Sequence, residues 1–64
     1  MKIEKRGTSF FIEVSRDELG ILNNCINDAM DLISPKEFGT RVGATPEEAE
    51  ALLDIIQRAL RNPE

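Results

Sequence analysis

The chain has 64 residues, of which twelve are acidic and eight are basic, so its formal net charge is −4. Its hydrophobic fraction of 41% and charged fraction of 31% are typical of a folded domain and exclude a disordered segment. Because a domain this small buries only about 60% of its unfolded surface, we expect one domain, residues 1–64, of modest stability.

The composition also predicts a cytoplasmic protein. Cys25 is the single cysteine, so no disulfide can form within the chain, which favours a reducing compartment. No apolar run approaches the roughly 20 residues of a membrane helix, and no apolar segment follows the basic start MKIEKRG. The chain has no histidine to activate Cys25 as a nucleophile, so we expect this side chain to be a packed thiol.

The N-terminal residues predict a β-hairpin. In the run TSFFIEV, Phe10 and Ile12 alternate with their neighbours at period two, the pattern of a strand. We expect strands at about residues 2–5 and 8–14, joined around Gly7. A free strand edge can pair with another chain, which makes a homodimer a further expectation.

One helix-start signal occurs three times after the hairpin. Each instance has a Ser or Thr cap and a Glu at the third helical position, which together form a capping box. An apolar residue before the cap and another after the Glu form the accompanying hydrophobic staple. The caps are Ser15, Ser34 and Thr45, and the acidic residues are Glu18, Glu37 and Glu48. Proline occupies the first turn after the second and third caps. We expect helices at about residues 16–33, 35–42 and 46–61.

The apolar stripe of the first helix is unusually wide, and we expect it to contact both the hairpin and another helix. Gly43 is the expected left-handed terminator of the second helix. Asp54 and Arg58 are spaced to pair on the third helix, and we expect Arg41 to form a structural clamp with a carboxylate of Glu37 or Glu48. The expected fold is α+β, an N-terminal hairpin followed by a compact three-helix unit.

The second and third helices have the spacing of a helix-turn-helix. Gly39 is placed where a small residue lets the second helix approach, and Gly43 where the turn needs one. The face that would read DNA carries Glu47, Glu50 and Asp54, and carboxylates repel the phosphate backbone. Nucleic acid is therefore a disfavoured partner. A helix-turn-helix-like transcriptional regulator, dimeric through strand pairing or the third helix, remains the alternative function.

The polar face of the first helix differs from an ordinary charged helix surface. Its side chains are short amides and carboxylates, namely Asn23, Asn24, Asn27, Asp28 and Asp31. Short amides can recognise a partner's backbone at little entropic cost, although the same face also fits a plain solvent-exposed surface. A regular helix lacks the shaped oxygen-rich loop that a metal site needs, so we expect neither metal nor cofactor. Carboxylates on open helix faces have scant room for a water-excluding pocket, so we expect no enzyme.

The runs LNNCINDAMDLI and EFGTRVGATPEEAEALL resemble a set of small bacterial proteins, mostly without an assigned role. These proteins share an "LNNALNE" type helix, then "EFxTRxG", then "EExxxLL". The matching residues are Leu22, Asn23, Asn24, Asn27, Glu37, Phe38, Thr40, Arg41, Gly43, Glu47, Glu48, Leu52 and Leu53. The chain departs from the pattern at Cys25 and Ile26. Some small acidic proteins of this type are immunity partners of bacterial toxins, and the resemblance implies such a role.

The sequence thus favours a non-enzymatic protein-interaction protein, in particular a small acidic immunity protein that occludes a basic toxin such as a nuclease. Acidic side chains would steer association with the cationic partner. The candidate partner-binding residues are Asn23, Asn24, Asn27, Asp28, Asp31, Glu47, Glu50 and Asp54.

Overall fold

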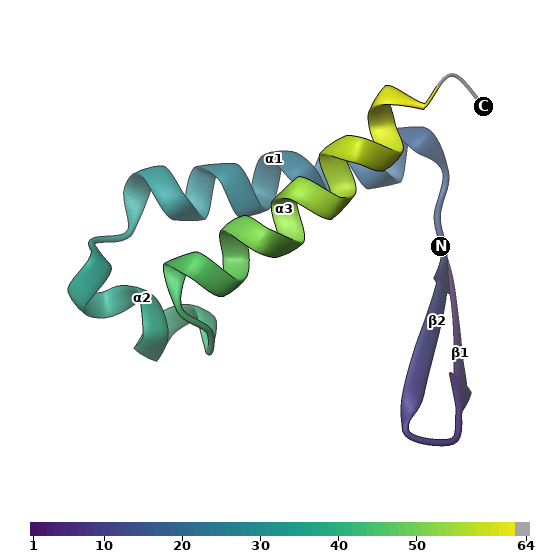
Figure 1. Ribbon diagram of the computed structural model, residues 1–64, viewed down its shortest axis with the longest axis horizontal. Helices are drawn as coiled ribbons and strands as arrows, with labels where there is room; N and C mark the ends of the chain where they lie inside the picture. The colour runs from purple at the N-terminus through teal and green to yellow at the C-terminus, as the bar shows by residue number, and fades with distance from the viewer. Residues whose placement is uncertain (63–64) are drawn as a thin grey trace.

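The computed structural model describes residues 1–62 and has the expected α+β order, a two-stranded hairpin followed by three helices (Figure 1). The elements are β1 (Lys2–Arg6), β2 (Ser9–Glu13), α1 (Arg16–Leu32), α2 (Pro35–Val42) and α3 (Pro46–Arg61). The expected bounds are confirmed to within a residue or so at each end. The last two residues of the expected domain lie outside the described range.

The hairpin is antiparallel, with Ile3 opposite Ile12 and Lys5 opposite Phe10. A two-residue turn joins the strands, and Gly7 adopts a positive φ of 60° there. Glycine at the first position of such a turn is the usual choice, because a side chain disfavours positive φ. Neighbouring strand residues point to opposite faces, so this register gathers Ile3, Phe10 and Ile12 on one face of the hairpin.

The other face of the hairpin is polar. It carries Lys2, Glu4 and Arg6 from β1, and Phe11 and Glu13 from β2. The Arg6 guanidinium donates to a Glu4 carboxylate oxygen at 3.0 Å and lies 4.4 Å from the centre of the Phe11 ring. The two adjacent phenylalanines therefore lie in different surroundings.

Helices α1 and α3 pack side by side and run antiparallel (Figure 1). The Arg16 guanidinium, at the start of α1, donates to the Leu60 carbonyl at 2.6 Å and also to the Asn62 carbonyl, at the end of α3. A cation at a helix C-terminus satisfies carbonyls that the last turn leaves free. Among residues 1–62, only Phe38 of α2 and Ala49 and Leu53 of α3 are buried.

Two of the three expected capping boxes form. Ser15 N–H donates to Glu18 at 2.9 Å and Thr45 N–H donates to Glu48 at 2.9 Å, while the Ser15 and Thr45 hydroxyls accept from the same glutamates' backbone N–H groups. The second expected box is wrong, because Ser34 makes no side-chain capping bond. The Glu37 carboxylate points to the other side and lies 3.8 Å from Arg41 Nε, the expected pairing of these two side chains.

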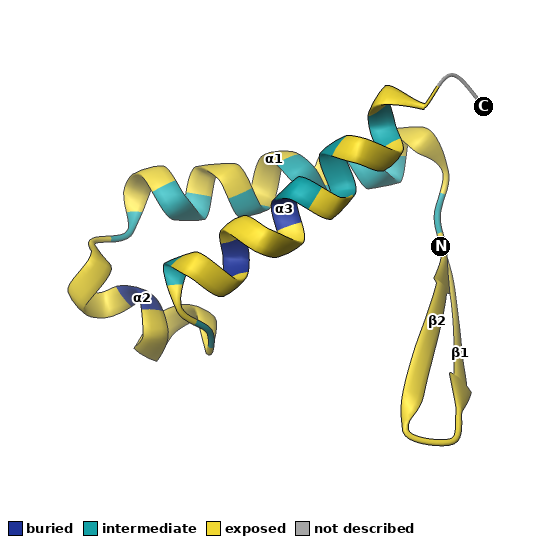
Figure 2. Ribbon diagram, viewed as in Figure 1, coloured by how far each residue is buried: buried dark blue, intermediate teal, exposed yellow. Residues whose placement is uncertain are grey.

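The expected contact between the hairpin and the first helix is confined to the base of the hairpin, where Met1 pairs with Glu18 and Ile12 lines a hollow together with Leu19 and Leu22. Both strands are exposed along their whole length, and the hairpin stands away from the helices (Figures 1 and 2). The wide apolar stripe of α1 is therefore covered on one flank only, by α3. The alternation that correctly predicted the strand gave no information about what its apolar face would contact.

The two glycines of the helix-turn-helix pattern have different roles. Gly43 is the left-handed cap of α2 with φ of 83°, as expected. Gly39 was expected to let the next helix approach, but a Cβ at this exposed position would meet nothing within 4 Å. That expectation is wrong, since α3 does not approach Gly39.

We predict opposite effects for alanine at these two glycines. Gly39→Ala should raise the free energy of unfolding by up to about 1 kcal/mol, because alanine favours a helix interior and has room here. Gly43→Ala should lower it by about 1 kcal/mol, because alanine is strained at positive φ. Urea denaturation followed by circular dichroism measures both. A loss of stability in Gly39→Ala would contradict the open environment of this residue.

The junction between β2 and α1 predicts a dependence of stability on pH. Hydrogen bonds from the Met1 ammonium and then from the Ser15 backbone lower the pKa of Glu18 from 4.5 to about 2. The ionised carboxylate therefore stabilises the folded state above about pH 4.5, and this stabilisation is lost as the pH falls towards 2. The pKa of Glu48 is lowered in the same direction, chiefly by the backbone hydrogen bond from Thr45.

Glu18→Gln should therefore reduce the loss of stability between pH 4.5 and 2, measured by denaturation at a fixed protein concentration. Glu13→Gln is the matched control, because the structure gives the Glu13 carboxylate no hydrogen bond or ion pair within residues 1–62. This control should keep the pH dependence of the original chain. An equal pH dependence in all three proteins would exclude the Glu18 junction as its source.

Candidate protein-interaction site

Helices α1 and α3 meet along a line of contact that we call the seam. The surface on one side of the seam is an open apolar groove, and the surface on the other side is polar. Near the hairpin the groove is lined by Leu22 and Ile26 of α1 with Leu52 and Ile56 of α3, and the chain's own Ile12, Val14 and Leu19 line its end. It continues to α2, where Ala29, Phe38 and Val42 line it and Glu48 contributes a carboxylate. Ile26 and Leu52 line both parts, so the groove follows the seam without interruption.

Cys25 lies at the edge of this groove and is exposed. The expectation of a packed thiol is therefore wrong. Its helical position does place it beside the apolar stripe, but no element covers that flank of α1 in the described part of the chain. Cys25 thus marks the groove with an accessible thiol.

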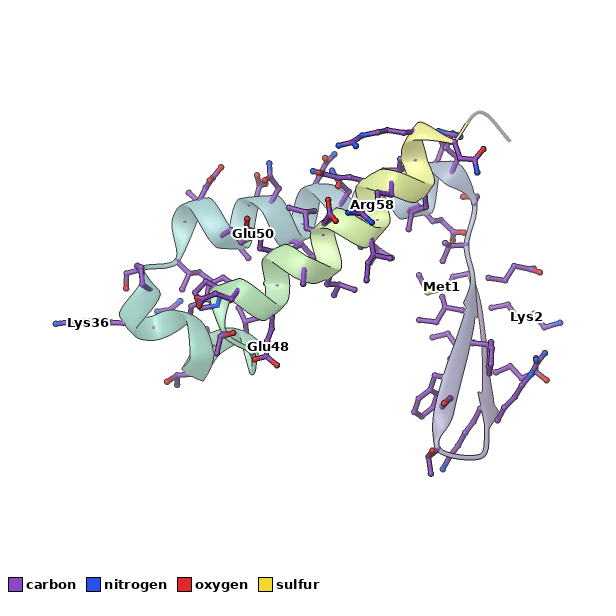
Figure 3. The ribbon with its side chains drawn as sticks, viewed as in Figure 1. Met1, Lys2, Lys36, Glu48, Glu50 and Arg58 are labelled. Carbon is purple, nitrogen blue, oxygen red and sulfur yellow. The ribbon has the colours of Figure 1, made fainter. Side chains whose placement is uncertain are left out.

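The opposite side of α3 is polar and holds three of the expected site residues. At 100° per residue, Glu47, Glu50 and Asp54 fall within an arc of about 60°. Figure 3 shows Glu50 and the groove-lining Glu48 on opposite edges of α3. Glu47 and Glu50 are exposed, whereas Asp54 is half-buried and pairs with Arg58 at 3.0 Å, as expected.

The amide-rich residues of α1 are spread around the side that faces away from the groove. Asn23 and Asn27 follow the groove residues Leu22 and Ile26 by one position, so they lie near the seam on the same side as Glu50. Asn24 and Asp31 lie further out, and Asp28 lies on the back of α1, farthest from α3 by helical position. Together these residues and the three acidic residues of α3 form the amide–acid face: Asn23, Asn24, Asn27, Asp28, Asp31, Glu47, Glu50 and Asp54.

The packing of α1 against α3 thus places Asn23 and Asn27 of the first patch on the side of Glu50 of the second, whereas Asp31, Asn24 and Asp28 lie progressively farther from the seam. Sequence reasoning missed the groove on the opposite side. The sequence contains an indication of this groove, because the apolar stripes of both helices are wider than a single helix–helix contact requires. The width of a stripe does not say which flank stays uncovered.

Asn23 differs from the other amides because its side-chain oxygen is covered by protein. Asn23 Oδ1 is buried and accepts no hydrogen bond within the described residues, while Nδ2 donates to Asn24 Oδ1 at 3.3 Å. A buried acceptor without a donor costs about 1–3 kcal/mol. Asn23 is therefore an unfavourable choice for stability at this position.

We predict that Asn23→Ala raises the free energy of unfolding by about 1 to 2 kcal/mol. The change removes the unpaired acceptor and introduces the better helix former. Asn27→Ala is the matched control on the same face, and it should gain only the helix-propensity part, about 0.5 kcal/mol. Thermal and urea denaturation measure both. Equal gains would show that the buried oxygen costs nothing.

The described residues contain no group of His, Cys, Asp or Glu side chains placed to hold a metal ion. No helix in residues 1–62 is both long enough and apolar enough to cross a bilayer. The surfaces of α1 and α3 carry hydrogen-bonding and charged groups on one side of the seam and apolar side chains on the other. Both are means of binding a protein surface.

Comparisons with protein-family models, with curated proteins and with solved structures find no match for this chain. The argument for function therefore rests on the chain's own surfaces.

Proposed function

We propose that this chain is a non-enzymatic interaction protein that binds a cationic protein surface through its amide–acid face. Its role is that of a small cytoplasmic immunity protein, and the partner is a basic toxin such as a nuclease. The observation that carries the proposal is the assembly of the amide–acid face from two helices. The antiparallel packing of α1 and α3 brings side chains from both patches to one side of the molecule.

The charges on these helices support a cationic partner. Two of the three basic residues of the helix pair are already engaged, since Arg16 donates to carbonyls at the end of α3 and Arg58 pairs with Asp54. The third, Arg61, lies in the last turn of α3. By contrast, no ion pair within residues 1–62 involves Asp28, Asp31, Glu47 or Glu50. The face therefore keeps uncompensated negative charge, which attracts a cationic surface over several ångströms and speeds association.

The mechanism of inhibition is occlusion. A nuclease collects positive charge in the groove that holds its phosphate backbone. Carboxylates of the amide–acid face compete for those cations, and the amides between them satisfy backbone groups at the rim. Such binding needs no chemical step and no pocket in the inhibitor.

The alternative, a nucleic-acid-binding regulator, is supported by the left-handed Gly43 turn between α2 and α3. It is opposed by the acidic residues of α3 on the face that would enter a groove of DNA. Retardation of duplex DNA at low salt by micromolar protein would favour this alternative over the immunity role.

The proposal predicts which charges control association. In Asp28→Lys combined with Asp31→Lys, the association rate with the protein encoded by the adjacent open reading frame, or with a purified basic nuclease, should fall at least about tenfold at low salt. Stability should remain nearly unchanged, because both side chains are exposed. Stopped-flow or surface plasmon resonance measures the rate.

The control is Glu4→Lys combined with Glu13→Lys, two changes on the polar face of the hairpin. It alters the net charge by the same amount but leaves the amide–acid face intact. This control should lose much less of the association rate. If both double variants bind equally slowly, net charge alone steers the partner and the localised face is wrong.

A further inference from the structure

The molecule exposes much more surface than a compact chain of its size. Its accessible surface is 5310 Å², whereas a compact monomer of 7.2 kDa exposes about 4,100 Å². Its radius of gyration of 13.1 Å likewise exceeds the roughly 10.7 Å of a compact domain of this length. The excess of about 1,200 Å² is more than the roughly 800 Å² that each partner buries in a standard interface.

Two elements expose large apolar side chains. On the apolar face of the hairpin, Ile3, Phe10 and Ile12 are 60%, 64% and 56% exposed, and in the groove Leu52 is 51% exposed. The apolar face of the hairpin is turned towards the helices. Figure 3 shows Met1 on the helix side of the hairpin and Lys2 on the opposite side. Contiguous apolar area of this kind marks a contact surface.

The hairpin is held away from the groove of its own chain. Only Val14 and Ser15 connect β2 to α1, and the Ser15 backbone is bound to Glu18. The same Glu18 carboxylate accepts from the Met1 ammonium at 2.8 Å, which ties the start of β1 to α1 as well. With both strands held at the base, the hairpin leaves most of the groove of its own chain uncovered, and only Ile12 lines the end of it.

We propose that a second copy of this chain covers these surfaces, with the hairpin of each copy lying in the groove of the other. One chain presents both the inserting element and the receiving groove, so a two-fold axis pairs them twice. The lengths agree, because α3 rises about 12 Å between Glu48 and Ile56 and a five-residue strand spans about 13 Å from its first to its last residue.

The charges on the two surfaces are complementary. Lys5 lies on the apolar face of the hairpin, opposite Phe10, and forms no ion pair within residues 1–62. Glu48 contributes the carboxylate among the side chains that line the groove beside α2. Reciprocal insertion brings opposite charges, rather than like ones, into the interface. The amide–acid face lies on the other side of the seam, so the dimer is independent of the proposed function.

Two adjacent phenylalanines give a matched test by sedimentation equilibrium. Phe10→Thr removes an aromatic ring from the apolar face, and Phe11→Thr removes one from the polar face, where Phe11 is 50% exposed. We expect the dimer dissociation constant to rise at least about tenfold for Phe10→Thr and to change little for Phe11→Thr. On α3, Leu52→Gln should weaken the dimer and Ile55→Gln, outside the groove residues, should not.

Mixing the variants tests the reciprocal arrangement. Each homodimer of Phe10→Thr or Leu52→Gln has two damaged contacts, whereas a mixed dimer has one contact made by an unaltered hairpin and an unaltered groove. The mixture should therefore dimerise more tightly than either variant alone. If mixing restores nothing, the hairpins do not insert into grooves and the proposal is wrong.

Cys25 reports on the groove without any substitution. A thiol-reactive dye should label it several-fold more slowly at protein concentrations above the dissociation constant than below it, and equally fast at all concentrations in Phe10→Thr. The melting temperature should rise with protein concentration in the same range. A chain that stays monomeric at millimolar concentration, with labelling independent of concentration, would overturn the proposal. Dimerisation must also survive the paired lysine changes at Asp28 and Asp31.

Discussion

The shape of this molecule depends on the junction at Ser15. There the Glu18 carboxylate accepts from both the Ser15 backbone and the Met1 ammonium, so one side chain ends β2, starts α1 and holds the first residue of the chain. A capping box specifies the direction in which the chain enters a helix. Because the hairpin is tied at this base, it projects from the helices. The exposed strands, the open groove and the large accessible surface all follow from that projection.

The packing of α1 against α3 determines where apolar and polar side chains lie on the surface of the molecule. The apolar stripe of α1 is wide enough for two neighbours but packs against α3 alone within the described chain, so one flank of the seam remains apolar and open. The other flank collects the short amides of α1 and the carboxylates of α3. In the two proposals, self-association would use the apolar flank and charge-steered partner binding the polar one, so the two would not compete for the same surface.

The buried core is small and lies in α2 and α3. Phe38 anchors α2, and Ala49 and Leu53 anchor α3, while no residue of the hairpin or of α1 is fully buried. Helix caps, proline in the first turn and the hydrogen bonds from Arg16 to the end of α3 therefore contribute much of the stability of the fold. Burial of the groove by a second copy would supply apolar contacts that 64 residues cannot supply alone.

The amino-acid sequence by itself determined the fold class, the five elements and nearly all of their bounds. These features depend on residues a few positions apart: the caps at Ser15 and Thr45, the left-handed Gly43 and the alternation around Phe10. It also identified the residues of the amide–acid face. Only the tertiary structure decided that Asn23 and Asn27 lie on the same side of the seam as Glu50, that Gly39 faces open space and that Cys25 is exposed. An apolar stripe shows how much surface a helix offers, but the neighbour that covers it depends on contacts between distant segments, which no local pattern contains.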